Sequence, residues 1–295
     1  MAIERSDRIC LVTGATNGIG EATARELARL GMTVVVAGRD KARAQQVVRE
    51  IRTATGNRNV DCLIADLSVM AGVRRLAAAF RARHDRMHVL VNNAGAIFTE
   101  RRETPDGLEM TFALNHLSYF LLTHLLLDLI VAAGTARKHA RIVNVSSGAH
   151  HSAALDFTDL QSKRRYNGLA VYSRSKLMNL MFTYALARQL KSQGVPLDVN
   201  ALHPGLVGSG FGHNNGLLTR FAMTVMKPFA RTPEQGAQTS IYLASSPEVE
   251  GVTGKYFVDE RAQASSQTAR DRDAQARLWA ISAELAGLVE SAHAG

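Results

Sequence analysis

Cysteine is scarce in this sequence, with only Cys10 and Cys62 among the 295 residues. Both lie in short apolar segments typical of strands, and neither is spaced from a histidine in the way that zinc ligands are. A disulfide-rich secreted scaffold is therefore excluded, and we expect two reduced cysteines in the core. We also expect no metal site.

Long uninterrupted apolar stretches are also missing. The most apolar one, residues 117–133, is interrupted by Ser118, His124 and Asp128, whereas a membrane-spanning helix needs about 20 largely apolar residues. The N-terminal residues 1–8 carry charges and lead directly into a strand-like segment, with no signal-peptide apolar region. We expect a cytoplasmic protein without a membrane span.

Acidic residues are too few to balance the basic ones: 26 Asp and Glu stand against 35 Lys and Arg, for a net charge of +9. A positive surface favours a phosphate-bearing partner, either a nucleic acid or a small phosphorylated ligand, and composition does not choose between them. Hydrophobic residues make up 46% of the chain, which is too many for a disordered protein and enough for a sizeable core.

Apolar segments of strand length alternate with amphipathic helical segments along most of the chain. Several strands are continuously apolar, as at Val34, Val35 and Val36, which is typical of a parallel sheet covered on both faces. Strands separated by helices need right-handed crossovers, so we predict a single α/β domain with a Rossmann-type, doubly wound parallel sheet of about seven strands. The predicted strands are residues 9–13, 33–37, 60–64, 89–92, 141–146, 198–202 and 256–258. The predicted helices are residues 19–30, 40–53, 69–83, 106–133, 171–193, 233–245 and 278–288.

The first predicted strand leads into the glycine-rich turn TGATNGIG at residues 13–20, which opens a helix. Glycines let the backbone approach a pyrophosphate closely, and the helix N-terminus adds unpaired N–H groups. A P-loop is disfavoured, because no Lys-Ser or Lys-Thr pair follows the last glycine. We predict a dinucleotide site here. Its expected residues are Gly14, Thr16, Asn17, Gly18, Ile19 and Gly20.

The end of the second strand bears on which dinucleotide is bound. An acidic side chain there would bind the adenosine ribose hydroxyls, but this chain has Gly38 and Arg39. Gly38 leaves space, and the Arg39 guanidinium suits a 2′-phosphate, so the sequence favours NADP(H) over NAD(H). The alternative is a solvated basic helix start, with Lys41 and Arg43 adding positive charge. Asp40 is expected to cap the following helix.

Three further polar clusters follow the later strands or open the next helix: Asn-Asn-Ala-Gly at residues 92–95, the pair Ser146-Ser147, and Tyr172 with Lys176. The last two residues are four apart, so they share one face of a helix. A phenol has a pKa near 10, and a lysine ammonium beside it would lower that pKa and make tyrosine a usable proton donor and acceptor. A tyrosine four residues before a lysine often arises by chance. Together with the glycine turn and the serine pair, it indicates a catalytic site.

In these motifs the chain resembles the short-chain dehydrogenase/reductase superfamily. Residues 13–20 resemble its cofactor turn, residues 92–95 its structural N-N-A-G, and Tyr172 with Lys176 its Y-x-x-x-K. Within the superfamily the chain is similar to the retinol dehydrogenase-like, NADP-preferring branch, and the resemblance covers about residues 7–290. The stretches that carry this similarity are residues 115–123, 159–162, 203–205, 236–246 and 254–257.

The resemblance implies a catalytic tetrad. Tyr172 would protonate the carbonyl oxygen in reduction or take the hydroxyl proton in oxidation. Ser147 would position that oxygen, and it is preferred over Ser146 because the family's serine is the second of the pair. Lys176 would bind the nicotinamide ribose and lower the pKa of Tyr172. Asn115 would hold a water that links Lys176 to solvent.

The resemblance also implies cofactor contacts beyond the glycine turn. Asp66 would contact the adenine, and it could also cap the helix that we expect at residues 68–81. Asn93 is expected to brace the sheet. His203 is expected to lie against the nicotinamide rather than to act in catalysis, and Ser209 stands where the family commonly has threonine. Further cofactor contacts are expected from Leu67, Asn93, Ala94, Gly95, Tyr172, Lys176, Pro204, Gly205 and Val207.

Together, the motifs and the resemblance imply an NADP(H)-dependent alcohol dehydrogenase or carbonyl reductase acting on a hydrophobic substrate. Residues 1–260 would form the catalytic domain, with residues 206–232 as a substrate lid. A subunit contact or a membrane-surface contact would also explain residues 206–232. Residues 261–295 would be a helical extension packed on the same domain.

Other functional readings remain open at the level of sequence. A catalytically silent NADP(H)-binding regulatory protein would need a broken tetrad, whereas all four residues are present. A nucleic-acid binder is suggested only by the net charge and lacks a recognisable recognition module, so we expect no nucleic-acid partner. A reductase of carbon–carbon double bonds would have the same motifs. A homo-oligomer is compatible with the family, and His150 and His151 are expected near the substrate pocket.

Overall fold

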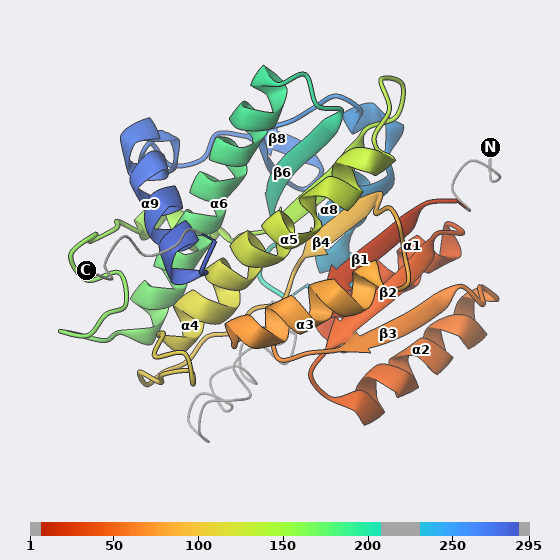
Figure 1. Ribbon diagram of the computed structural model, residues 1–295, viewed down its shortest axis with the longest axis horizontal. Helices are drawn as coiled ribbons and strands as arrows, with labels where there is room; N and C mark the ends of the chain where they lie inside the picture. The colour runs from red at the N-terminus through yellow and green to blue at the C-terminus, as the bar shows by residue number, and fades with distance from the viewer. Residues whose placement is uncertain (1–6, 208–230, 289–295) are drawn as a thin grey trace.

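The computed structural model describes residues 7–207 and 231–288, which form one α/β domain (Figure 1). Its single sheet has the strand order β3-β2-β1-β4-β5-β6-β7-β8, and helices cover both faces. Crossing from β3 on one side of β1 to β4 on the other gives the doubly wound topology predicted from the sequence. The strands are β1 (Ile9–Thr13), β2 (Thr33–Gly38), β3 (Val60–Ile64), β4 (Val89–Asn92), β5 (Ala140–Val145), β6 (Leu197–His203), β7 (Tyr256–Val258) and β8 (Arg261–Gln263).

The sheet has one strand more than we predicted. β8 pairs with β7 in an antiparallel register, with Phe257 opposite Ala262, whereas the other strands are parallel. All three residues of β8 are exposed. The segment has no apolar periodicity, so only its pairing with β7 makes it a strand.

The core consists of two apolar layers, one on each face of the sheet. Leu11 and Val35 pack into one layer, while Val12 and Val34 pack into the other. Because consecutive side chains of a strand point to opposite faces, a strand buried on both faces must be continuously apolar. This explains the uninterrupted valines of β2.

Most helices are close to their predicted positions, but the helix predicted at residues 278–288 begins at Arg272 and ends at Leu285. Asp40 caps α2 as expected, since its carboxylate accepts a hydrogen bond of 3.0 Å from the Arg43 backbone N–H. The expected cap at Asp66 is wrong: α3 begins at Met70, whose N–H donates to the Asp106 carboxylate at 2.8 Å. The helices of this half are α1 (Gly18–Arg29), α2 (Lys41–Thr55) and α3 (Met70–Arg81).

The helix predicted at residues 106–133 begins later and is not regular. Glu109 caps a short α4 (Met110–Phe112), a π-helical turn follows at Ala113–Leu117, and α5 (Ser118–Ala133) completes it. The run Met110–Ala133 reaches a mean hydropathy of 1.6, so length and composition alone would let it cross a membrane. Its most apolar window is 56% buried in the fold, as expected of a core helix, so this is weak evidence for a span.

The C-terminal residues pack on the same domain. Trp279 lies edge-on to Phe120 and His124, which joins α9 (Arg272–Leu285) to α5. Of the predicted lid, only residues 206–207 and 231–232 are described, and Val207 pairs with Arg231 in an isolated bridge. Ser209 lies outside the described residues. The remaining long helices are α6 (Gly168–Ser192) and α8 (Pro233–Ser245).

Candidate active site

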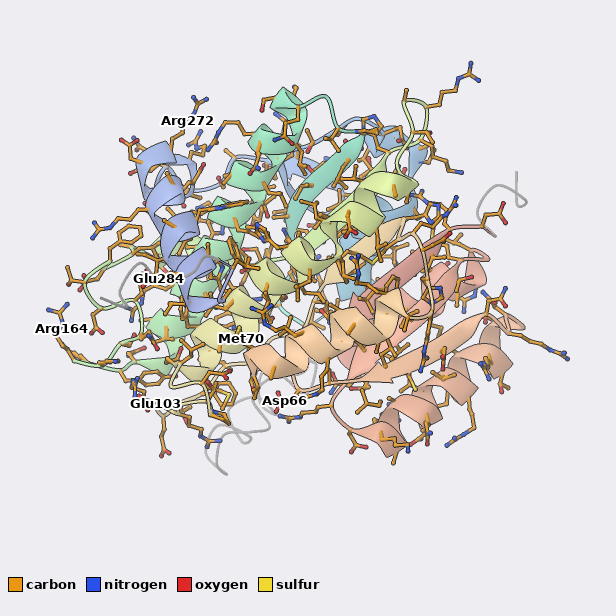
Figure 2. All side chains as sticks on the ribbon, viewed as in Figure 1. Asp66, Met70, Glu103, Arg164, Arg272 and Glu284 are labelled. Carbon is orange, nitrogen blue, oxygen red and sulfur yellow. The ribbon has the colours of Figure 1, made fainter. Side chains whose placement is uncertain are left out.

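The parallel strands bring the predicted site residues to one edge of the sheet. β1 to β6 all run in the same direction, so the segments that follow their carboxyl ends lie along this edge. α6 begins there as well, and Figure 2 labels Asp66 at this edge beside the start of α3. The segments at the edge are residues 13–20, 38–40, 66–67, 93–96, 146–148, 168–176 and 203–207.

The glycine turn leaves the first backbone N–H groups of α1 available. α1 begins at Gly18, and the Asn17 side chain makes no capping hydrogen bond with it. Gly14 and Gly18 have φ values of +63° and +55°, a conformation that favours glycine. An anion placed at this helix start would meet unpaired donors and the positive end of the helix dipole, which fits a pyrophosphate.

The turn packs directly against the end of β4. A Cβ atom at Gly20 would lie 2.4 Å from the Asn93 side-chain nitrogen and 2.4 Å from the Gly14 oxygen. The same Asn93 nitrogen donates to the Thr13 carbonyl oxygen at 2.8 Å, so Asn93 braces β1 against β4, as expected. Ala94 also lies against the turn, because a Cβ at Gly14 would approach its Cα to 2.8 Å. This cradle is built from backbone and has no space for additional side chains.

An arginine without a hydrogen-bond or ion-pair partner among the described residues, Arg39, follows β2. Gly38 is required for packing, since a Cβ there would lie 2.4 Å from the Thr16 methyl group. Arg43 is already engaged, donating to the Thr16 carbonyl at 3.0 Å and pairing with Glu21 at 2.9 Å. Arg39 is exposed and makes no hydrogen bond or ion pair within residues 7–207 and 231–288. Its guanidinium is therefore available to a ligand phosphate beside the turn.

The two residues after β3 have different surroundings. Asp66 is exposed, and its carboxylate accepts hydrogen bonds from the backbone and hydroxyl of Ser68 at 2.9 and 2.7 Å. Leu67 is only 6% exposed and belongs to the apolar core. The expected contact of Leu67 with a cofactor would therefore be made by its backbone.

The segment after β6 lies next to the start of α1. A Cβ at Gly236 of α8 would approach Val207 to 2.5 Å and Ile19 to 3.3 Å, so these two side chains converge on the same point. Pro204 is buried, and Gly205 has a φ of +82°. Val207, a predicted cofactor residue after β6, is thus brought together with Ile19 of the glycine turn.

Tyr172 and Lys176 lie one turn apart on α6, with the Lys176 Nζ atom 5.6 Å from the centre of the Tyr172 ring. The Ser147 side chain hydrogen-bonds to that of Tyr172. Ser146 is buried instead, and its hydroxyl donates to the Lys176 carbonyl oxygen at 2.7 Å. The geometry therefore agrees with Ser147, not Ser146, as the serine that faces a substrate.

Asn115 and Gly95 complete this cluster. The Asn115 amide donates to the Ala96 carbonyl at 2.9 Å and to the Ser175 hydroxyl at 3.0 Å. A Cβ at Gly95 would lie 3.2 Å from the Asn115 side-chain oxygen and 3.5 Å from Lys176 Nζ. The π-helical turn thus holds Asn115 beside Lys176, fully buried.

Burial dominates the ionisation of both catalytic candidates. It raises the pKa of Tyr172 to about 12, against the opposing effect of the Ser147 hydrogen bond. It lowers the pKa of Lys176 to about 7, and Lys176 Nζ donates to the Val145 carbonyl at 3.0 Å. The expected lowering of the tyrosine pKa is therefore not found in the protein alone. The low-dielectric surroundings disfavour charge on both side chains.

The histidines near the site have structural surroundings. His150 is fully buried and hydrogen-bonds to the Ser147 carbonyl at 2.7 Å and the Ser266 N–H at 3.2 Å. It fastens the turn after β5 to the C-terminal segment, so the expectation that it lines the substrate pocket is wrong. The His203 Nδ1 atom is buried without a hydrogen-bond partner in the described part of the chain.

A group of metal-ligand type lies at the opposite edge of the sheet. His139, Asp198 and Glu250 bring their ligand atoms within 4.8 Å of one another. These groups are already paired: His139 with Asp198 at 3.0 Å, and Glu250 with Arg141 at 2.8 Å. The arrangement is an ion-pair network at the amino ends of β5 and β6.

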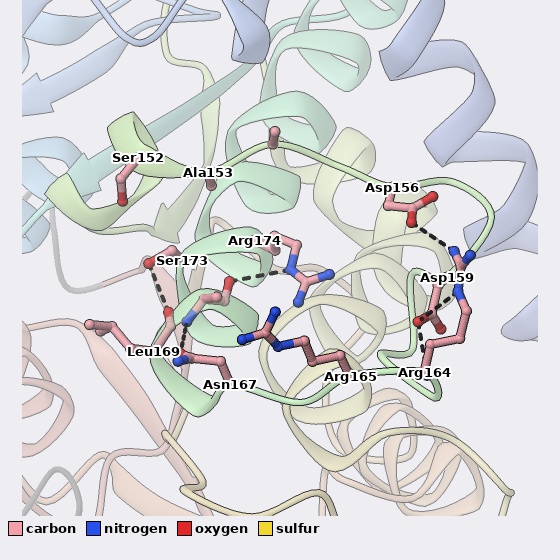
Figure 3. Close-up of a pocket in the computed structure, with 12 residues that line it drawn as sticks. Ser152, Ala153, Asp156, Asp159, Arg164, Arg165, Asn167, Leu169, Ser173 and Arg174 are labelled. Atoms are coloured by element: carbon pink, nitrogen blue, oxygen red, sulfur yellow. Dashed lines mark hydrogen bonds and ion pairs between the residues drawn. The ribbon is translucent and has the colours of Figure 1, made fainter.

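A cavity that the sequence did not predict lies beside the first turns of α6. Its volume is about 680 Å³, and Arg165 and Arg174 lie side by side in it (Figure 3). Arg164 is neutralised by Asp156, at 2.8 Å. Leu169 on its wall is 64% exposed. The basic run at residues 163–165 was the signal in the sequence, but without a fold it could not be placed next to α6.

Known proteins with similar sequences and structures belong to one family. A family model described as short chain dehydrogenase matches residues 8–216. Human polyprenol dehydrogenase is 41% identical over 97% of this chain and 87% of its own length. Human retinol dehydrogenase 11 is 40% identical over 97% of this chain and 88% of its own. The solved structure of Pseudomonas aeruginosa RhlG with NADP at its active site has a TM-score of 0.68 and 29% identity, over 85% of this chain and 94% of that one.

Proposed function

This chain belongs to the short-chain dehydrogenase family and binds a nicotinamide dinucleotide, and we propose that it interconverts a hydrophobic alcohol and its aldehyde or ketone with NADP(H). The resemblance to retinol dehydrogenase-like members is confirmed by the relatives. The observation that carries the proposal is the hydrogen bond between Ser147 and Tyr172, with Lys176 on the next turn of the same helix.

The bound nicotinamide supplies the hydride chemistry, and the protein manages the proton. Ser147 orients the substrate oxygen, and the Tyr172 hydroxyl donates a proton to it in reduction or removes one in oxidation. Because burial raises the pKa of Tyr172 to about 12, the phenol of the protein alone is a weak acid, and almost none of it is ionised to act as a base at neutral pH. Lys176 offsets this only when protonated and close to the phenol, and its pKa near 7 puts it close to half protonation in the protein alone.

Arg39 supports the preference for NADP(H). It projects from the end of β2 beside the glycine turn, and within the described residues no carboxylate neutralises it. A 2′-phosphate would form a charge-assisted hydrogen bond with such a guanidinium, and an unphosphorylated ribose would not. The neighbouring Arg43 cannot easily replace it, because Thr16 and Glu21 hold it in place.

The substrate class rests on the apolar residues near the site and on the relatives. Leu169 and Leu206 are 64% and 56% exposed. Relatives at about 40% identity are named for polyprenol and retinol, both apolar alcohols. We propose the cytoplasm as the location of the protein.

Fluorescence titration with NADPH and NADH, followed by an activity panel, tests this function. We expect tighter binding of NADPH and turnover with long-chain aldehydes, ketones or alcohols, read from the absorbance of the reduced nicotinamide. Activated alkenes belong in the panel, because their reduction in place of carbonyl reduction would change the reaction type. Tight NADPH binding without any turnover would indicate a silent regulatory protein and contradict the proposal.

A further inference from the structure

A second cavity lies between α6, β7, β8 and α9. It has a volume of about 440 Å³, and α6 contributes Tyr184, Ala187, Arg188 and Lys191 from one helix face. Arg188 follows Tyr172 by 16 residues, which places it about 24 Å along the helix at 1.5 Å per residue. The cavity is therefore separate from the candidate active site.

The charged residues that line this cavity are all basic. No carboxylate is among its lining residues in the described part of the chain. The nearest acidic residue in the sequence, Asp271, caps α9 by accepting hydrogen bonds from the N–H groups of Asp273 and Ala274. Figure 2 labels Arg272, which marks this end of α9. The four basic residues are Arg188, Lys191, Lys255 and Arg270.

Part of this basic cluster is held in place by the fold. Arg188 donates to the side-chain oxygen of Gln275 at 3.0 Å, and Gln275 is itself buried and donates to the Ala269 carbonyl at 2.8 Å. Lys255 is fixed through its backbone, whose N–H donates to the Asn200 side chain at 3.0 Å.

The side-chain charges of the other three basic residues are free to meet a ligand. Lys191, Lys255 and Arg270 make no side-chain hydrogen bond or ion pair with another described residue. Arg270 lies close enough to Tyr184 to oppose, with a Ser265 hydrogen bond, the rise in the Tyr184 pKa that burial causes. The cavity thus also offers a phenol hydroxyl beside a guanidinium.

We propose that this cavity, the basic pocket, binds a phosphate group carried by a small molecule or by a lipid headgroup. Four cations that line one cavity without a carboxylate are suited to a group with several negative oxygens. The volume lies at the lower end of the range for small-ligand sites and exceeds what a lone phosphate ion needs. Such a site lies outside the reaction proposed above and does not depend on it.

The test uses the whole protein saturated with NADP+, so that the cofactor site is filled, and inorganic pyrophosphate as the probe in calorimetry. We expect one pyrophosphate to bind per chain. Lys255→Gln combined with Arg270→Gln should weaken this binding about tenfold or more, because the charge-assisted hydrogen bonds of both side chains to the anion are lost. Both residues are exposed, so NADPH binding and thermal stability should be unchanged.

A matched control removes two positive charges elsewhere. Arg58→Gln combined with Arg75→Gln alters exposed residues outside the pocket and should leave pyrophosphate affinity within about twofold, because screened surface charges act weakly at a distance. Undetectable binding to the wild-type protein at millimolar pyrophosphate would overturn the proposal. Equal weakening in both double variants would also overturn it, since the anion would then be sensing only net charge.

Sedimentation with vesicles separates the two sources of phosphate. Phosphatidylcholine vesicles with and without phosphatidic acid are compared for the wild type and both double variants. Sedimentation that requires phosphatidic acid and is lost only in the pocket variant supports the site and assigns a lipid headgroup. Pyrophosphate binding at the pocket without such sedimentation supports the site and assigns a soluble phosphorylated molecule.

Discussion

The glycine turn and the tyrosine cluster stand at the same edge of one sheet but are built in opposite ways. In the turn, function depends on side chains that are missing, since a single Cβ at Gly20 would collide with both Asn93 and Gly14. In the cluster, function depends on polar side chains that are buried, such as Lys176 at 2% exposure. Cofactor binding at the turn therefore depends on the shape of the backbone, and proton transfer in the cluster depends on the ionisation of buried side chains.

This difference determines how each region should fail. Overfilling the turn strains the backbone and removes the surface that a pyrophosphate would contact, so binding and stability fall together. Altering one atom of the cluster leaves the shape intact and changes proton transfer alone. The variants below separate these two modes.

Tyr172→Phe removes a single oxygen from the cluster and should have the largest effect. We expect turnover at saturating NADPH to fall by at least about 100-fold, because the proton donor is lost, while NADPH affinity measured by fluorescence stays within about twofold. Tyr166→Phe is the matched control, since the Tyr166 hydroxyl donates to the Phe98 carbonyl at 3.0 Å, away from Ser147. Undiminished turnover in Tyr172→Phe would refute the mechanism.

Gly20→Ala overfills the turn. We expect NADPH binding to be largely lost and the protein to be destabilised by about 1–3 kcal/mol, as measured by fluorescence titration and thermal unfolding. Gly31→Ala is the control, because a Cβ there meets no atom within 4 Å and only the φ of +87° is unfavourable. It should cost about 1 kcal/mol and leave cofactor affinity unchanged. Normal NADPH affinity in Gly20→Ala would show that the turn is not the pyrophosphate site.

Lys176→Met tests burial in the cluster through pH. The folded-state pKa of Lys176 is lowered to about 7. Above this pH the unfolded chain binds more protons at Lys176 than the folded protein does, so the unfolding free energy of the protein should rise with pH. The variant lacks this contribution. The stability of the wild type relative to Lys176→Met should therefore increase from about pH 7 to about pH 9 in urea titrations of the cofactor-free protein. A difference that is constant over this range would contradict strong desolvation of the lysine.

Arg39→Ala should have the smallest effect, because Arg39 is exposed. We expect NADPH affinity to fall about tenfold and NADH affinity to change little, since one charge-assisted hydrogen bond to a phosphate is lost. Arg58→Ala, at another exposed arginine, controls for net charge. Equal binding of the two cofactors by the wild-type protein would remove the basis for assigning this role to Arg39.

Much of the fold could be predicted from short-range pattern. Strands β1, β3, β4 and β7 have the predicted bounds, because each is a short, mostly apolar segment between turn residues. The cap of α3 could not be predicted, since the Met70 N–H at its start is satisfied by Asp106, 36 residues away in the chain. The π-helical turn at Asn115 likewise depends on contacts with Ala96 and Ser175, which local sequence does not encode.

The identity of the site residues was more predictable than their electrostatics. The motifs placed Ser147, Tyr172 and Lys176 at one edge, and the structure brings them together. The pKa of Tyr172 was predicted with the wrong direction, because the spacing to Lys176 gives no measure of how deeply both groups are buried. The engagement of Arg43 by Glu21 was also hidden, since it joins two separate helices.

The short antiparallel β8 has a consequence for how copies of the protein meet in solution. An exposed strand edge is a template on which another chain can add a strand, and such addition leads to aggregation. β8 is three residues long, fully exposed, and includes the charged Arg261, features that discourage strand addition at this end of the sheet. Any self-association of this protein is therefore better served by its helical faces than by continuation of its sheet through β8.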